Sequence, residues 1–96
     1  MAITIDTVRM VRSAGKVSAA AFDAALETAP DSVADELSGP ANECEDYYET
    51  AVEALLDDDL AAAHEALLDA MSLEGHWTNY GPSHDALAAV EAAARG

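Results

Sequence analysis

Apolar residues recur every three or four positions through most of this chain, which is the spacing of an amphipathic α-helix. The clearest example is the segment from Asn42 to Ser72. Its first half opens with a capping pair, Asn42 and Glu45, and its inward positions are Cys44, Tyr48, Ala51, Val52 and Leu55. After three aspartates the stripe restarts, with inward positions at Leu60, Ala63, Leu67, Leu68 and Met71. The pattern predicts two antiparallel helices joined at residues 57–59, with one long kinked helix as the alternative.

The first forty residues show the same period in shorter runs. Residues 3–14 form a predicted helix with inward positions at Ile5, Val8, Met10 and Val11. Gly15 is expected to stop or kink this helix, and a second helical run covers residues 18–28. Pro30 ends that run because proline cannot continue a helix. A short connecting helix is then predicted over residues 31–37, closed by Ser38, Gly39 and Pro40.

The last quarter of the chain contains a loop and a final helix. Gly75 is expected to close the helix that begins at Leu60, and the loop that follows carries Trp77 and Tyr80. Ser83 is a predicted N-cap, and the helix after it has inward positions at Leu87, Val90 and Ala94. No segment alternates long enough to predict a strand. The expected fold is therefore all-α: residues 1–96 form one domain, a small helical bundle of four main helices plus a short connecting helix, centred on an antiparallel helical hairpin.

Composition makes the expected core thin. Hydrophobic residues are 51% of the 96 positions, but 23 of them are alanine. Alanine favours helix formation and buries little apolar area. Small chains with few large apolar residues often complete a core by pairing with a copy of themselves, so a homodimer is one expectation.

The charge is strongly acidic and unevenly placed. Nineteen Asp and Glu against four Lys and Arg give a net charge of −15. Three of the four bases, Arg9, Arg12 and Lys16, recur along one side of the first helix. A field of this sign repels nucleic acid and anionic membranes and attracts basic proteins, so we expect direct binding of neither nucleic acid nor membrane. The basic stripe is expected to pair with the protein's own carboxylates, or else to orient a second copy or a partner.

The sequence carries no motif for catalysis, a metal or a cofactor. His64 and Glu65 begin like the zinc-protease helix motif, but Leu68 stands where the second histidine is required. The aspartates at 57–59 lack the spacing of a calcium-binding EF-hand loop. Cys44 lies among acids adjacent in sequence, which are expected to raise the pKa of its thiol and suppress the nucleophilic thiolate. We therefore predict a non-catalytic protein that uses neither a metal nor a cofactor.

Other sequence features favour a cytoplasmic location. A single cysteine allows no internal disulfide, which suits a reducing compartment. The N-terminal residues lack the apolar core of a signal peptide, and no run approaches the roughly 20 apolar residues that span a bilayer. The expected protein is soluble and cytosolic.

The outward face of residues 43–59 is a dense set of carboxylates. Glu45, Glu49 and Glu53 follow one another at i, i+4 and i+8, so this acidic row rises about 6 Å per step along one line of the helix. We name the row and its neighbours the acidic surface, which consists of Glu43, Glu45, Asp46, Glu49, Glu53, Asp57, Asp58 and Asp59. Like charges at this spacing destabilise a helix, and the sequence offers no structural reason for them. The acidic surface is therefore the predicted partner-binding site.

Three interpretations of the acidic surface remain open. One is an inhibitor or nucleic-acid mimic that binds a basic protein surface, as small acidic anti-CRISPR and anti-restriction proteins of mobile elements do, because a spacing of about 6 Å is comparable with that of phosphates along a strand. Another is halophilic adaptation, in which molar salt screens the charges. The third is a structural or adaptor role as a homodimer. Trp77 and Tyr80 are expected either to plug the core or to form a secondary partner contact.

Overall fold

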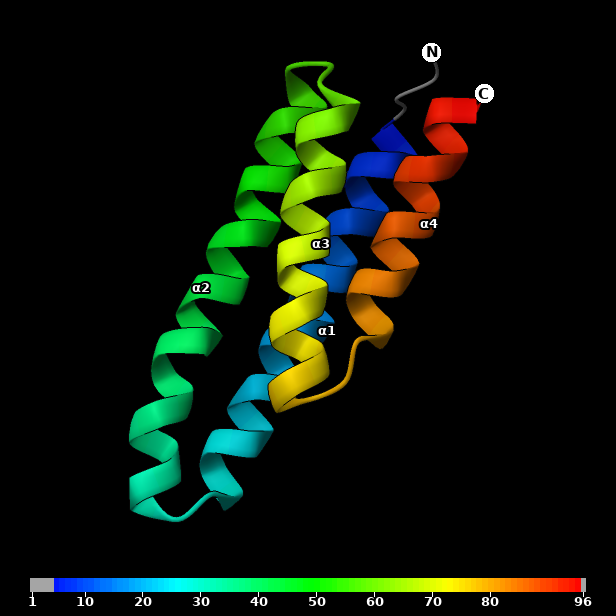
Figure 1. The fold of residues 1–96 in the computed structure, drawn as a ribbon. Coiled ribbons are helices and arrows are strands. Elements are labelled where there is room, and N and C mark those ends of the chain that lie inside the picture. Colours follow the sequence, from blue (N-terminus) through cyan, green and yellow to red (C-terminus); the bar gives the residue numbers. More distant parts are fainter. Residues whose placement is uncertain (1–4, 96) are drawn as a thin grey trace.

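The computed structural model describes residues 5–95, which form four helices and no strand (Figure 1). The helices are α1 (Ile5–Thr28), α2 (Asp31–Leu56), α3 (Leu60–Trp77) and α4 (Gly81–Arg95). Helix α1 packs against α2 and α4, and α3 packs against the same two helices. The fold is thus an all-α bundle in which each helix has two main neighbours. Ile3, which the predicted first helix includes, lies outside the described residues.

The predicted break at Gly15 is wrong, because α1 continues through it. Gly15 instead allows α1 to approach the ring of Tyr48 on α2. A Cβ at Gly15 would lie 3.2 Å from both Cβ and Cγ of Tyr48, closer than most real contacts of this kind. The glycine therefore allows close contact between two helices. From the local sequence alone, the same glycine predicts a helix end.

The separate connecting helix over residues 31–37 is also wrong, because it forms the first turns of α2, which passes through Pro40. Proline inside a helix costs about 3 kcal/mol. Part of the conflict is normally a clash with the Cβ of the preceding residue, and Gly39 has none. Leu37 and Cys44 lie on either side of Pro40 and are both buried. Their burial on one face keeps α2 in one piece.

Three other predicted helix ends also differ from the structure. Asn42 lies in the interior of α2 and is therefore not a cap. Helix α3 runs past Gly75, and α4 begins at Gly81, which places Ser83 within its first turn instead of at the N-cap. Glycine inside a helix costs only about 1 kcal/mol, so tertiary packing decides where these helices end.

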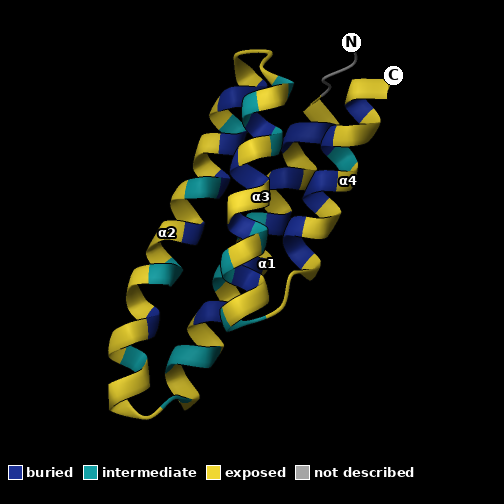
Figure 2. Cartoon of the chain, viewed as in Figure 1, coloured by how far each residue is buried: buried dark blue, intermediate teal, exposed yellow. Residues whose placement is uncertain are grey.

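The core is a narrow stripe along the inner side of each helix (Figure 2). Its most buried large apolar side chains are Val11, Phe22, Leu37, Leu55, Leu67 and Val90. Four positions predicted to face inward are exposed, namely Ile5, Met10, Leu68 and Ala94. Met10 and Leu68 are each next in sequence to a buried residue. Because neighbouring side chains point about 100° apart around a helix, Met10 and Leu68 lie off the buried stripe.

The bundle is elongated, with extents of 46 × 17 × 16 Å. The C-terminal half of α1 and the N-terminal half of α2 extend beyond α3 and α4, and the start of α1 and the end of α4 lie at the opposite end (Figure 1). Helices α2 and α3 are joined by the turn at Asp57, Asp58 and Asp59 and lie side by side. The acidic surface therefore occupies the half of α2 that packs against the full bundle, together with the turn.

Candidate functional site

All eight carboxylates of the acidic surface are exposed. Five of them lie on α2, and the other three form the turn that leads into α3. Every acidic residue of the chain falls within residues 5–95, and among them only Glu74 is buried. The structure thus brings the predicted site residues together along one helix and its end.

Two of the three acids in the turn have a structural role that the sequence analysis did not identify. Asp58 has a φ of 63°, a left-handed conformation that Asp and Asn tolerate better than most residues. The side chain of Asp59 caps α3 by accepting a 3.0 Å hydrogen bond from the N–H of Ala62. The interpretation that these acids lack a structural reason is therefore wrong for Asp58 and Asp59.

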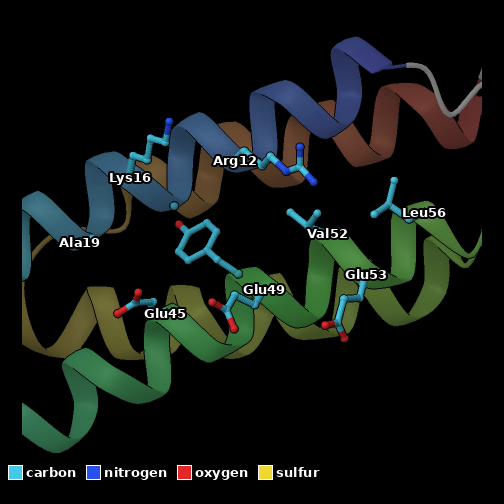
Figure 3. A pocket seen from close by; sticks show the side chains of 10 residues that line it. Arg12, Lys16, Ala19, Glu45, Glu49, Val52, Glu53 and Leu56 are labelled. Atoms are coloured by element: carbon cyan, nitrogen blue, oxygen red, sulfur yellow. The ribbon is translucent and has the colours of Figure 1, made fainter.

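The acidic row lines one wall of a groove between α1 and α2, with a volume of about 600 Å³ (Figure 3). The opposite wall is part of α1 and carries Arg12 and Lys16. Neither base makes an ion pair within 4.0 Å among the described residues. Arg9, the third base of the predicted stripe, pairs with Asp6 at 3.7 Å. The expected pairing with the protein's own carboxylates is thus confirmed for Arg9 alone.

The acidic row runs beside an apolar ridge. Tyr48, Val52 and Leu56 recur at every fourth residue of α2 and line the same groove. Tyr48 is buried, Val52 is half-buried, and Leu56 is 64% exposed. The sequence pattern predicts Val52 in the core and does not predict this ridge. Carboxylates beside partly accessible apolar side chains resemble the polar rim around an apolar interface centre.

A buried polar network lies at the middle of the bundle, centred on Glu74 of α3, which is completely buried. The hydroxyl of Tyr48 donates to its Oε2 at 2.5 Å, and the N–H of Ser83 donates to its Oε1 at 3.0 Å. The thiol of Cys44 lies 3.8 Å from Oε2 and 3.5 Å from the hydroxyl of Ser18. Because Ser18 belongs to α1 and Ser83 to α4, the network joins all four helices.

The protonation of Cys44 follows from this position. Burial raises the pKa of its thiol from 9.0 to about 11, and the carboxylate of Glu74 adds to the rise while the hydrogen bond with Ser18 opposes it. The predicted direction is confirmed, but the cause is burial and Glu74 instead of the acids adjacent in sequence. A thiol with this pKa stays protonated near neutral pH and is a poor nucleophile.

The sequence holds a signal for the burial of Glu74. The stripe of α3 through Ala63, Leu67 and Met71 continues, at helical spacing, to position 74. An acid at such a position lies on the inner face and needs donors from the facing helices. The predicted inward positions stop at Met71, although Glu74 lies before the expected helix end at Gly75.

The loop aromatics and the histidines occupy separate places. Trp77 is half-buried and packs against the core, whereas Tyr80 is 58% exposed. His64 lies 3.5 Å from Glu91, and His84 lies 3.9 Å from the carboxylate of its neighbour. Within residues 5–95 no three side chains of His, Cys, Asp or Glu gather as a metal site requires.

Comparisons of this chain with protein-family models, with curated proteins and with solved structures found no match. None of the described helices combines the length and apolarity needed to cross a membrane.

Proposed function

We propose that this protein acts without catalysis, by binding a basic protein surface through its acidic surface. The observation that carries the proposal is the exposed row of Glu45, Glu49 and Glu53 on α2, beside an apolar ridge and without an ion pair among the described residues. Beside these charges Val52 is half-buried and Leu56 is 64% exposed, so the row combines charged and apolar side chains. An interface uses both, because apolar contacts supply affinity and charges supply orientation and association rate.

The partner proposed is a protein whose basic groove holds nucleic acid. Carboxylates at about 6 Å intervals along a rigid helix present a line of negative charge to cations that otherwise contact phosphates. The protein then acts as an inhibitor or nucleic-acid mimic, of the kind that mobile elements direct against CRISPR or restriction defences. The net charge of −15 favours rapid association with such a groove at low salt.

The experiment is a quantitative binding comparison. The immobilised protein captures basic proteins from lysate, and each captured protein is purified and its affinity measured. Replacement of Glu45, Glu49 and Glu53 by Gln should weaken binding about 10- to 100-fold, from roughly 0.5–1 kcal/mol per charge pair. The matched control replaces Glu27, Glu36 and Glu65, which are exposed elsewhere, and removes the same charge. Equal losses in the two variants would show that only net charge matters and would refute the site.

Halophilic adaptation is the second candidate, and one observation favours it. Exposed acids occur on all four helices, for example Asp23 on α1, Asp69 on α3 and Glu91 on α4. A surface that serves only one interface does not need acids on every side. In molar salt these charges are screened, and the protein is expected to depend on that screening for its stability.

A further inference from the structure

The groove between α1 and α2 is apolar along its middle. Helix α2 contributes the ridge of Tyr48, Val52 and Leu56, and α1 faces it with the small residues Gly15 and Ala19. Tyr48 already packs closely against Gly15, so the space that side chains from outside can occupy lies along Val52 and Leu56. The volume of about 600 Å³ is consistent with that space.

The two walls of the groove carry opposite charges. Arg12 and Lys16 lie on the α1 wall, and Glu45, Glu49 and Glu53 lie on the α2 wall (Figure 3). Two of the four Lys and Arg residues of the chain are therefore in this one groove. For a molecule with a net charge of −15, most encounters between copies are repulsive. The groove is a place where that repulsion is locally relieved.

Symmetry makes the groove complementary to itself. A two-fold axis that runs along the groove places α1 of one copy over α2 of the other copy. Each base of one copy then lies opposite the acidic row of the other copy. A two-fold axis across the groove would instead place bases on bases and acids on acids. The opposite charges of the walls therefore favour a single isologous arrangement.

We propose that two copies of this chain associate face to face through the groove, about a two-fold axis along it. Helices α1 and α2 of both copies surround this axis as four helices, and Val52 and Leu56 of each copy fill the groove of the other. Arg12 and Lys16 pair with the acidic row of the second copy. This dimer is independent of the proposed function, but it covers the same carboxylates, so a second copy and a basic partner compete for them.

The test is the mass of the full-length protein in solution, measured by sedimentation and light scattering over a dilution series. The wild-type protein should approach twice 10.0 kDa at high micromolar concentration. Arg12→Glu with Lys16→Glu should weaken the dimer at least about 100-fold, because four symmetry-related pairs become repulsive. Glu49→Lys with Glu53→Lys should do the same. An equimolar mixture of the two variants should recover the double mass, since only unlike copies are then complementary.

The matched control for charge is Arg9→Glu with Arg95→Glu, which makes the same change outside the groove and should keep the dimer. Circular dichroism shows whether each variant folds. If a variant is unfolded, Leu56→Asp is used in its place, because Leu56 is exposed. A wild-type protein that stays monomeric throughout the series would overturn the proposal. So would a dimer that survives both reversals, or a mixture that stays monomeric. Loss of the dimer in the Arg12→Glu, Lys16→Glu variant leaves the acidic surface intact, so the proposed function can be tested on that variant alone.

Discussion

The hydroxyl of Tyr48 on α2 donates a hydrogen bond to the carboxylate of Glu74 on α3, and both residues are buried. The other oxygen of Glu74 accepts the N–H of Ser83 in the first turn of α4, where the helix dipole favours a negative charge. A buried carboxylate is tolerated only when donors replace the water it has lost. Glu74 therefore links α3 to both α2 and α4 by hydrogen bonds.

Removal of the Tyr48 hydroxyl should destabilise the fold. Tyr48→Phe leaves the carboxylate of Glu74 short of a donor, which is expected to lower the free energy of unfolding by about 1–3 kcal/mol. Urea denaturation followed by circular dichroism measures the change. A double-mutant cycle with Glu74→Gln should give a coupling energy on the order of 1 kcal/mol or more, since the two residues share one hydrogen bond.

Tyr47→Phe is the control for this substitution. Tyr47 is the adjacent residue on α2 and is only half-buried. The same chemical change there should alter the free energy of unfolding by less than about 0.5 kcal/mol. Equal effects at the two tyrosines would mean that the hydrogen bond to Glu74 does not support the bundle.

Alanine substitutions at two glycines should have opposite effects. Gly75→Ala adds a Cβ with nothing within 4 Å, so it should stabilise α3 by about 0.5–1 kcal/mol through helix propensity. Gly15→Ala gains the same propensity, but its Cβ meets Tyr48 at 3.2 Å. Because Tyr48 is also held by Glu74, overpacking of roughly 1–3 kcal/mol should exceed that gain. Thermal melts of both variants beside the wild-type protein measure the difference, and a more stable Gly15→Ala protein would contradict this account.

These glycines explain why the fold class was predictable and the helix ends were not. Helical periodicity and outward acids follow from local spacing, so the all-α fold and the exposure of the acidic surface could be predicted. Gly15 and the Gly39–Pro40 pair are local signals for a break. They are overridden by contacts with residues distant in sequence, such as Tyr48 against Gly15. The helix propensities of single residues do not include the energy of such tertiary contacts.

The groove and the buried network were not predictable for a related reason. The donors to Glu74 lie 26 and 9 residues away in the chain, so its burial appears only when α2, α3 and α4 are placed together. The groove likewise depends on how α1 and α2 are rotated about their axes. That rotation brings Arg12 and Lys16 opposite the acidic row, whereas the sequence alone left their partner open.

Substitutions in the turn should distinguish the acids that stabilise the fold from those that only face solvent. Asp59→Ala removes the cap of α3 and should lower the free energy of unfolding by about 1 kcal/mol. Asp58→Gly should be neutral or stabilising, because glycine adopts the φ of 63° without strain. Asp57→Ala should change stability by less than about 0.5 kcal/mol. Urea denaturation of the three variants gives this order, and a neutral Asp59→Ala would show that the cap does not contribute.

Stability should fall at alkaline pH because of the buried thiol. The folded protein holds the Cys44 proton up to a pKa of about 11, whereas the ordinary thiol pKa is 9.0. Between these values the unfolded chain loses its proton first, so ionisation favours unfolding. The contribution is fully present below pH 9 and is lost as the pH rises towards 11. Burial also raises the pKa of Tyr48 above its usual 10.0, which acts in the same direction at higher pH.

The check is a series of urea midpoints from neutral pH to pH 11, compared with those of Cys44→Ala. The variant loses a small buried side chain and should be less stable at neutral pH. Its midpoint should fall less steeply above pH 9, because one of the titrating groups is gone. Identical slopes for the two proteins would show that Cys44 does not titrate differently in the folded state.

Salt should distinguish a binding surface from halophilic adaptation. Eighteen of the 19 acids are exposed, and their mutual repulsion is screened over about 10 Å at 0.1 M salt and about 3 Å at 1 M. If the acids serve a partner, the buried network and the core must hold the fold without molar salt. Circular dichroism should then show the same helical content at about 0.1 M and about 3 M KCl. Unfolding at the lower concentration that is reversed at the higher one would favour the halophilic interpretation. It would also mean that the acidic row is exposed because the solvent screens it, and the proposed partner site on α2 would lose its main support.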